Sequence, residues 1–481
     1  MIITNSIVLF AAVAQVYGAT INKRYNYAPQ FSPSFPPMAK PTGVVTSYNP
    51  GPYDTSSTLS TTPLSGFPEP WSKPDTNHPE VQAVYNKLDL SKIPKAPVRK
   101  QKSDGSWVSS SDGASDPYCW WSSTNCVVPK TNLLPPDIYT CPNKGDWGLN
   151  YDDGPFNRYT DSNAAVENKY AEPALYNFLA ENNLHSTLFY IGSNVATYPA
   201  AAQRGLNDGH QLCVHTWSHP PLTTQTNIQI VAELYWTLKA IKAATGVTSR
   251  CFRPPQGDVD DRVRAIAWQM GMRTVLWDRD SEDWNLPALG SGSLSPAVVD
   301  GYFSNWINTY KSGKDTSGHI VLEHELNHAT VNMSMFWLPK LTKTFNVIPA
   351  LSCNGITKDI YWEDFEYPTY GADGSTTTKT TPTATSTSSS TTKATTTKPT
   401  TTKTTTTTTK TTTTTTKTTT TTTKTTSKAT TKTTTTKAPT STSTKCTAGV
   451  SGKKQGNGDS GYCCTSSDDC IETCRSGVCG L

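Results

Sequence analysis

The chain has 481 residues and a formal net charge of +4, and 35% of its residues are hydrophobic. Eleven lysines and no acidic residues lie between Ser375 and Lys445, so the remainder carries a charge of about −7. A mildly acidic folded part argues against a nucleic-acid partner. Beyond the N-terminal apolar run, no segment has the length and apolar composition of a membrane span, so no membrane insertion is expected.

The chain begins with a short apolar run, Ile7 to Ala14, followed by small residues up to Ala19. The run is too short to span a bilayer, so residues 1–19 are predicted to be a cleaved secretory signal peptide, with an uncleaved anchor as the alternative. The product is expected to be secreted, and extracellular or cell-wall associated.

Residues 20–135 are rich in Pro, Ser and Thr. They predict an extended, poorly packed segment with one helical turn near Pro79–Tyr85.

Strand-like and helix-like patterns alternate in the next part of the chain, residues 136–360. The helix-like patterns cover residues 171–181, 228–244 and 259–270. This alternation predicts an α/β domain, a distorted and partly open (β/α) barrel of about seven parallel strands. An open doubly wound sheet is the alternative, without a glycine-rich phosphate-binding sequence to support it. The strand-like runs are residues 147–150, 186–191, 211–215, 251–253, 274–278, 320–324 and 346–351.

Two segments of unusual composition follow this domain. Residues 375–445 are almost entirely Thr, Lys, Ser, Ala and Pro, which predicts an extended, O-glycosylated linker. Residues 446–481 contain six of the twelve cysteines, and so short a module needs a disulfide framework. Its Cys463-Cys464 pair and Tyr462 faintly resemble hevein-type chitin-binding modules, although later cysteine spacings depart from them. A chitin-binding module and an inert cap are both open.

Five polar stretches lie at the ends of strand-like runs in residues 136–360. Side chains at the carboxyl ends of barrel strands meet on one face, so these stretches are expected to form one site. They contain the carboxylates, imidazoles and guanidinium group that a metal-assisted hydrolase needs. The stretches are Asp152-Asp153-Gly154-Pro155, His215-Thr216-Trp217-Ser218-His219, Arg253-Pro254-Pro255, Asp280-Ser281-Glu282-Asp283-Trp284 and Leu322-Glu323-His324.

His215 and His219 are four residues apart, the spacing of two metal ligands on a helix. Thr216 replaces the Glu of a helical zinc-protease motif, and two prolines follow His219, so a turn after a strand is expected instead. Asp152 and Asp153 project differently, so one can bind a metal while the other accepts a proton from water. An Asp/His/His set with an open position predicts one divalent ion, zinc most readily, with cobalt also fitting.

In their order and composition, the five stretches resemble the motifs of the polysaccharide deacetylases of carbohydrate esterase family four, which have the NodB-homology fold. The resemblance covers about residues 140–355 and is closest to fungal chitin deacetylases. It implies that Asp153, His215 and His219 bind the metal. The other implied catalytic roles are the general base Asp152, held by Arg253, and the catalytic acid His324, tuned by Asp280.

The resemblance also implies substrate contacts. Trp284 and Leu322 would line the pocket for the acetyl methyl group, and Pro255 and Gln256 would lie beside the substrate. Gln256 stands where the family usually has Tyr, but its backbone N–H can still stabilise an oxyanion. A second departure is Asn150-Tyr151, where the family usually has Thr-Phe before the two aspartates.

The remaining expectations concern covalent modifications. Cys141 and Cys353 flank the strand–helix series and are expected to form a disulfide, as in fungal relatives. For Cys213 and Cys251, buried free thiols are favoured over a bridge. Asn332 begins an Asn-Met-Ser sequence and is a predicted N-glycosylation site.

The first functional hypothesis is a chitin deacetylase that acts as a monomer on chitin or a related cell-wall polysaccharide. The second is a deacetylase of peptidoglycan glycan or acetyl xylan. The third is a catalytically silent carbohydrate-binding protein, which the intact set of acid, base and ligands disfavours.

Overall fold

The computed structural model describes residues 26–48, 58–103, 105–108 and 115–370, with short strands at 376–377, 447–451, 462–463, 473–475 and 478–480. The chain divides into two compact units. The first contains the described residues up to 377, and the second contains the strands from residue 447 onward. The predicted signal peptide and most of the predicted linker lie outside the described residues.

The centre of the first unit is a parallel sheet of six strands in the order β5-β4-β3-β2-β1-β8. A seventh and an eighth strand, β6 and β7, pair with each other, also in parallel. The strands are β1 (Asp146–Asp152), β2 (Thr187–Tyr190), β3 (Gln211–Val214), β4 (Cys251–Phe252), β5 (Arg273–Thr274), β6 (Arg279–Asp280), β7 (Val321–Leu322) and β8 (Asn346–Pro349).

Single bridges join the two sheets along β1. Trp147 and Asp152 of β1 pair with His319 and His324, at either end of β7, and β6 follows β5 directly in the chain. On the opposite edge of β1, β8 pairs with its first half and β2 with its second half. The α/β class with a parallel sheet is therefore confirmed, and the pairing is consistent with a distorted barrel.

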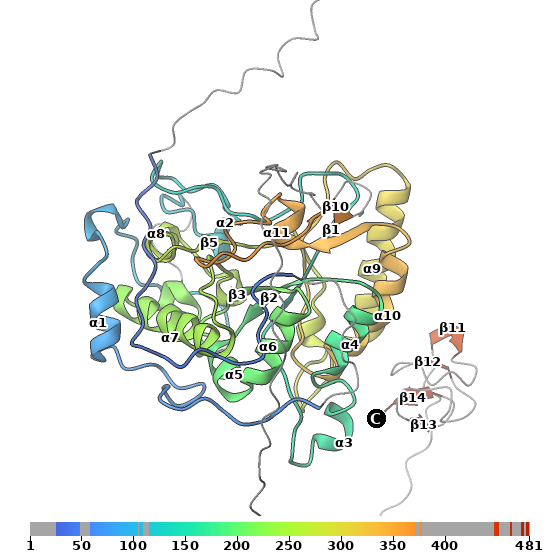
Figure 1. Ribbon diagram of the computed structural model, residues 1–481. Helices are drawn as coiled ribbons and strands as arrows, with labels where there is room; N and C mark the ends of the chain where they lie inside the picture. The colour runs from blue at the N-terminus through green and yellow to red at the C-terminus, as the bar shows by residue number, and fades with distance from the viewer. Residues whose placement is uncertain are drawn as a thin grey trace, which may run out of the picture. The chain divides into compact units, whose positions relative to one another are not determined.

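Helices surround these strands (Figure 1). The longest is α7, which starts at a capping box formed by Thr226 and Gln229 and ends at Gly246 in the left-handed conformation. The helices are α1 (Pro79–Tyr85), α2 (Trp121–Thr124), α3 (Ala164–Glu167), α4 (Ala174–Glu181), α5 (Gly192–Thr197), α6 (Pro199–Asn207), α7 (Asn227–Thr245), α8 (Asp261–Gln269), α9 (Pro296–Lys311), α10 (His328–Leu341) and α11 (Ala350–Cys353). Short 3-10 turns are η1 (Leu90–Lys92), η2 (Leu222–Thr224), η3 (Pro255–Gly257) and η4 (Asp283–Asn285).

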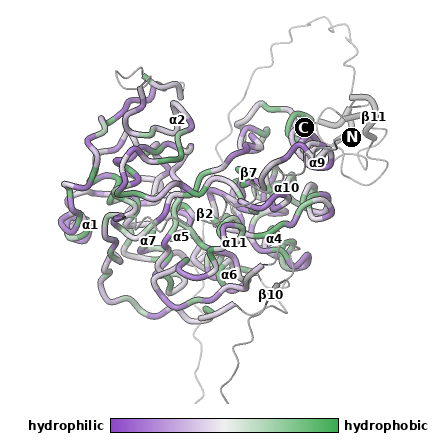
Figure 2. Tube along the Cα trace, turned by 90° about the horizontal axis from the view of Figure 1, so that it is seen from above, coloured by the Kyte–Doolittle hydropathy of each residue, from purple (hydrophilic) through white to green (hydrophobic). Residues whose placement is uncertain are grey.

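The N-terminal segment is extended, with the predicted helical turn at α1, but the expectation of poor packing was wrong. Val81 and Val84 of α1 are buried in the core, and Ile93 follows them. α1 lies beside α7 at one edge of the unit (Figures 1 and 2), where Glu80 pairs with Lys239 at 2.7 Å. The apolar residues of this segment are scattered among prolines without a period, so the sequence pattern gave no sign of their burial.

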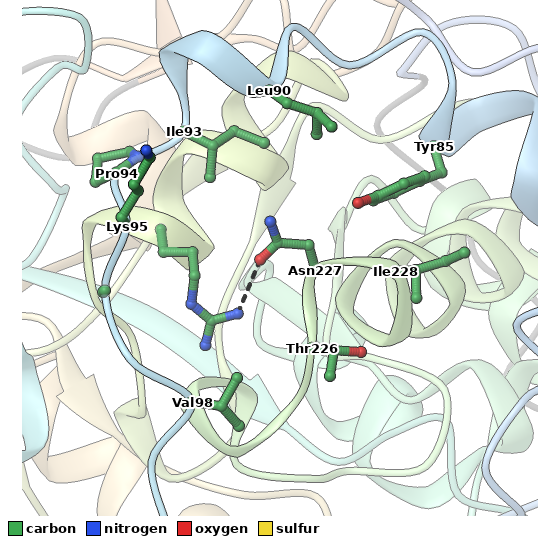
Figure 3. Close-up of a pocket in the computed structure, with 11 residues that line it drawn as sticks. Tyr85, Leu90, Ile93, Pro94, Lys95, Val98, Thr226, Asn227 and Ile228 are labelled. Carbon is green, nitrogen blue, oxygen red and sulfur yellow. Dashed lines mark hydrogen bonds between the residues drawn. The ribbon is translucent and has the colours of Figure 1, made fainter.

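The same segment leaves a cavity where it crosses the start of α7. This cavity, of about 480 Å³, is lined by mainly apolar side chains, including Tyr85, Leu90 and Ile93, with Thr226 and Asn227 on the opposite wall (Figure 3). None of the residues expected to carry catalysis lines it.

The described residues contain three disulfides. Cys141–Cys353 joins the two ends of the strand–helix series as expected, and Cys119–Cys126 closes a small loop in the N-terminal segment. Cys213 and Cys251 are also bonded, so the preference for free thiols was wrong. The reason is strand order: β3 and β4 are neighbours in register, which brings the two Cα atoms within 5.0 Å. Among the described helices, none combines the length and apolar composition of a membrane span.

Candidate metal and catalytic site

The five polar stretches meet at the carboxyl ends of the parallel strands, as the sequence predicted. Asp152 ends β1, His215 directly follows β3, and Arg253 directly follows β4. The stretch containing Asp283 continues from β6, and His324 lies just beyond β7. Because all these strands run in the same direction, their ends share one face of the domain.

Three side chains converge on a point where a cation can bind. One ligand atom each from Asp153, His215 and His219 lies within 4.8 Å of the others. Asp153 Oδ1 is 3.4 Å from the Nε2 atom of both histidines. These are the three residues that the sequence predicted as ligands.

The protonation of the site suits a metal ion. His215 Nδ1 is 2.8 Å from the carbonyl oxygen of Arg253, which can only accept, so Nδ1 carries a hydrogen and Nε2 is the ring nitrogen left to face a cation. Burial is the main cause that lowers the pKa of His219 to about 4, so this imidazole is neutral at pH 7. Asp153 Oδ1 is buried and has no hydrogen-bond partner in the described part of the chain. An orphaned carboxylate oxygen facing two imidazole nitrogens fits a divalent cation.

Backbone conformation helps to aim these ligands. Asp153 (φ +75°), Thr216 (φ +68°) and His219 (φ +60°) all lie in the left-handed region, which residues other than glycine adopt infrequently. Thr216 and His219 turn the backbone sharply between the two histidines. His215 and His219, four residues apart, can therefore face one metal ion although they do not lie on a helix. Clusters of unfavourable backbone conformation are typical of functional sites.

Asp152 is held by a buried arginine. Arg253 Nη1 donates to Asp152 Oδ1 at 2.6 Å and to Asn150 Oδ1 at 2.5 Å, and Nη2 donates to the Leu276 carbonyl at 3.0 Å. The second oxygen of Asp152 lies 3.6 Å from His215 Nε2, on the metal side. Asn150, a departure from the family pattern, therefore orients the arginine that orients Asp152.

His324 pairs with Asp283, not with Asp280. Its Nδ1 lies 2.6 Å from Asp283 Oδ1, and its backbone N–H donates to Asp283 Oδ2 at 2.9 Å. Burial lowers the pKa of His324, but Asp283 and the two metal-side aspartates outweigh burial and raise it to about 10. His324 is therefore protonated at neutral pH and can donate a proton.

This contact makes Asp283, not Asp280, the hydrogen-bonded partner of His324, and Asp280 interacts with His324 only through charge. Asp280 instead accepts a hydrogen bond from the backbone of Glu282 at 2.8 Å. Both aspartates belong to one short stretch, and only the turn at η4 brings Asp283 beside His324.

The predicted substrate-binding residues differ in exposure. Leu322 and Pro255 are buried, Gln256 is exposed, and Trp284 is 49% exposed. Their contacts with a substrate remain predictions.

Asn332, the predicted glycosylation site, lies inside α10, and Ser334, the third residue of the Asn-Met-Ser sequence, is buried against the Tyr151 hydroxyl. Glycosylation there would have to precede the folding of α10.

A buried acid behind the site, Glu325, was not predicted from the sequence. Glu325 accepts a hydrogen bond from the Tyr176 hydroxyl at 2.9 Å, and burial raises its pKa to about 8. A Cβ atom at Gly154 would lie 1.8 Å from Glu325 Oε1, so a larger residue there would displace the buried Glu325 side chain. In the sequence, Gly154 of Asp-Asp-Gly-Pro was the only sign that another side chain packs against this turn.

Comparisons with known proteins agree with this geometry. The family model described as "Polysaccharide deacetylase" matches residues 140–275. The chain is 37% identical to "Chitin deacetylase" of Amylomyces rouxii over 374 residues, 75% of this chain and 84% of that protein. It is 36% identical to "Chitin deacetylase 2" of Cryptococcus neoformans var. grubii over 314 residues, 64% of this chain and 66% of that protein.

Among solved structures, the chitin deacetylase from Colletotrichum lindemuthianum is similar, with 21% identity and a TM-score of 0.41, covering 48% of this chain and 97% of that one. The extent of the match to the Amylomyces rouxii protein, together with the family model, establishes the family. The chain belongs to the polysaccharide deacetylases of carbohydrate esterase family four.

Proposed function

We propose that this protein removes acetyl groups from the N-acetylglucosamine units of chitin, giving chitosan and acetate. The observation that carries the proposal is the placement of a proton acceptor, Asp152, and a charged proton donor, His324, around one candidate metal site. Chitin as the substrate is supported by the relatives, which are named chitin deacetylases.

Hydrolysis of an acetamide needs a nucleophile, a stabilised oxyanion and a protonated leaving group. A divalent ion bound by Asp153, His215 and His219 would polarise the acetyl carbonyl and lower the pKa of water. Asp152, fixed by Arg253, takes the proton from the attacking water. The Gln256 backbone N–H would stabilise the developing oxyanion, as the resemblance to the family implies. His324 gives its proton to the amine nitrogen as the carbon–nitrogen bond breaks, and Asp283 keeps the imidazole oriented.

Secretion is part of the proposal. Three disulfides in the described residues favour an oxidising compartment, and the short apolar run at the N-terminus would direct the chain there. The expected location is the cell exterior or the cell wall, where the polysaccharide substrate would be found.

The deciding experiment is acetate release by the purified protein from chitin oligomers, acetyl xylan and peptidoglycan glycan. We expect release from chitin oligomers, its loss on chelation, and its return on adding zinc or cobalt. Full activity in a sample verified to be metal-free would contradict the metal site. Acetate from acetyl xylan or peptidoglycan but not from chitin would contradict the substrate. No acetate from any of the three would favour a carbohydrate-binding protein.

A further inference from the structure

A β-hairpin from the N-terminal segment contacts the catalytic domain beside the site. Lys100 and Val108 are joined by a backbone hydrogen bond of 2.9 Å, and Gln101 pairs with Trp107 across the hairpin. The hairpin precedes the family match, which begins at residue 140, so the family motifs assign it no role.

The hairpin and the catalytic domain contact each other through a pair of glutamine side chains. Gln101 Nε2 donates to Gln256 Oε1 at 3.1 Å and to the Gly105 carbonyl at 2.9 Å. Gln256 lies on η3, three residues after the arginine that holds Asp152, and its backbone is in the left-handed region (φ +57°). The hairpin therefore contacts the loop that follows Arg253, at the carboxyl end of β4, through the exposed side chain of Gln256.

The segment after the hairpin is firmly anchored to the same loop. The buried carboxylate of Asp258 accepts hydrogen bonds from Trp120 Nε1 (2.9 Å) and Ser122 Oγ (2.8 Å) on one oxygen. On the other oxygen it accepts from the backbone N–H and hydroxyl of Thr223, each at 2.7 Å. One carboxylate thus joins the N-terminal segment, the turn after His219 and the loop containing Gln256.

Aromatic packing completes this anchor. Trp107 of the hairpin contacts Trp120 edge-to-face, with ring centroids 5.1 Å apart. A Cβ atom at Gly257 would lie 2.3 Å from the Trp121 ring, so this ring packs directly on the backbone of the catalytic loop. The hairpin is held in one position relative to the site, which a binding surface requires.

The glutamine pair leaves polar groups available to a ligand. Gln101 Nε2 uses both hydrogens, so its Oε1 remains as an acceptor, and the Nε2 of Gln256 remains as a donor. Within the described residues, neither atom has a hydrogen-bond partner in the protein. An acceptor beside a donor at the rim of the site matches the hydroxyl and acetamido groups of a sugar unit.

We propose that Gln101 and Gln256 form a subsite that binds a neighbouring sugar unit of the polysaccharide, not the unit that loses its acetyl group. The inference rests on the proposed action on an N-acetylglucosamine polymer. In it, the N-terminal segment contributes part of the surface that binds the polymer. It makes the efficiency of the enzyme depend on chain length through a residue outside the family motifs.

The test compares Gln101→Ala with Lys102→Ala, a change of an exposed side chain on the same hairpin. For each zinc-loaded protein, kcat and KM are measured on N-acetylglucosamine oligomers of two to six units. Losing neutral hydrogen bonds to a sugar costs about 1–1.5 kcal/mol, which is roughly a tenfold change. We expect Gln101→Ala to lose about tenfold in kcat/KM on the longest oligomers, mainly through KM. The shortest oligomer and the Lys102→Ala variant should keep wild-type values.

The dependence on oligomer length separates a subsite from a structural contact, because the two glutamines are hydrogen-bonded to each other and are coupled in either case. If they bind one sugar unit, the double variant Gln101→Ala/Gln256→Ala loses less than the product of the two single losses on long oligomers, and this difference shrinks on the shortest oligomer. An equal loss on every oligomer would mean that Gln101 only orders the loop and would overturn the subsite, as would unchanged kinetics. Binding of the hexamer, measured by calorimetry on Asp152→Asn with and without Gln101→Ala, gives the same comparison independently of turnover. If the wild type bound the hexamer tightly but did not deacetylate it, the proposed function would be contradicted, whereas the subsite would not.

Discussion

At the scale of single residues, the two groups proposed to transfer protons, Asp152 and His324, are held by different partners. Arg253 holds Asp152 through a bond of 2.6 Å, and Asp283 holds His324 through another of 2.6 Å. The metal ligands lie between them, with Asp153 beside Asp152 in sequence. Since each group has its own partner, the base and the acid can be altered separately.

Replacing Asp152 by Asn should remove the base and keep the metal. An amide oxygen can still accept from Arg253, but it cannot take up the proton of water. We expect kcat to fall by about 10²–10⁴-fold, with the zinc content of the purified protein unchanged. Acetate release and elemental analysis on the same sample measure both. A variant within a few-fold of wild type would show that another group is the base.

Replacing Asp283 by Asn should change the pH dependence. Asp283 is the main partner that raises the pKa of His324, to about 10, against the effect of burial. The acid works only while protonated, so activity is lost as pH rises through this pKa. Without the negative charge the pKa falls, and the alkaline limb of the kcat/KM profile should move to lower pH.

Asp280→Asn is the matched control, because Asp280 makes no hydrogen bond to His324 in the described structure. Because the charges of Asp280 and His324 still attract each other without a hydrogen bond, its alkaline limb should move less than that of Asp283→Asn. A larger shift in Asp280→Asn than in Asp283→Asn would restore the role first expected of Asp280.

The sequence was sufficient to predict the metal ligands but not the partner of the acid. Asp153, His215 and His219 each stand at a strand end, and parallel strands bring such positions together. Asp280 and Asp283 are only three residues apart, so the choice between them depends on the course of one turn. Side-chain contacts of that kind are set by local backbone geometry, which residue types alone do not specify.

At the scale of elements, the strands were predictable and the N-terminal segment was not. Strand β1 is buried along its whole length. Its large apolar residues Trp147, Leu149 and Tyr151 occupy every second position, a spacing that predicts a strand. The segment before residue 135 packs through scattered contacts such as Phe31 and Ile93, which follow no helical or strand period. The Cys213–Cys251 bridge was missed for a related reason, because it depends on strand order and register.

Asp258 gives a test of how firmly the N-terminal segment is attached. Its carboxylate accepts four hydrogen bonds from buried or partly buried donors, contributed by Trp120, Ser122 and Thr223. Leaving a buried donor without a partner costs about 1–3 kcal/mol. Asp258→Ala should therefore lower the free energy of unfolding by at least about 2 kcal/mol, measured by urea denaturation.

The exposed Asp364 provides the control, and Asp364→Ala should leave that free energy within about 0.5 kcal/mol of the wild type. If Asp258→Ala were equally harmless, the contacts around its carboxylate would not anchor the segment. The catalytic loop would then owe its position to the barrel alone.

At the scale of the whole molecule, the candidate catalytic residues and the disulfides found among the described residues all belong to the first unit. The intervening Thr- and Lys-rich residues carry almost no apolar side chains with which to dock on a folded surface. A glycosylated linker of this composition would extend and separate the Cys-rich module from the catalytic site. We propose that the module holds the enzyme on solid polymer without taking part in catalysis, the alternative being an inert cap.

Truncation after Gly371 tests this division of labour. Tethering raises the effective concentration of substrate near the enzyme, which matters for an insoluble polymer and hardly for a freely diffusing oligomer. The truncated protein should therefore deacetylate soluble chitin oligomers with the kcat/KM of the full chain, while the fraction that sediments with solid chitin falls. A second variant that keeps the linker and lacks only residues 446–481 assigns the retention to the module. If either truncation reduced turnover of soluble oligomers as much as retention on the solid, the module would belong to the catalytic unit.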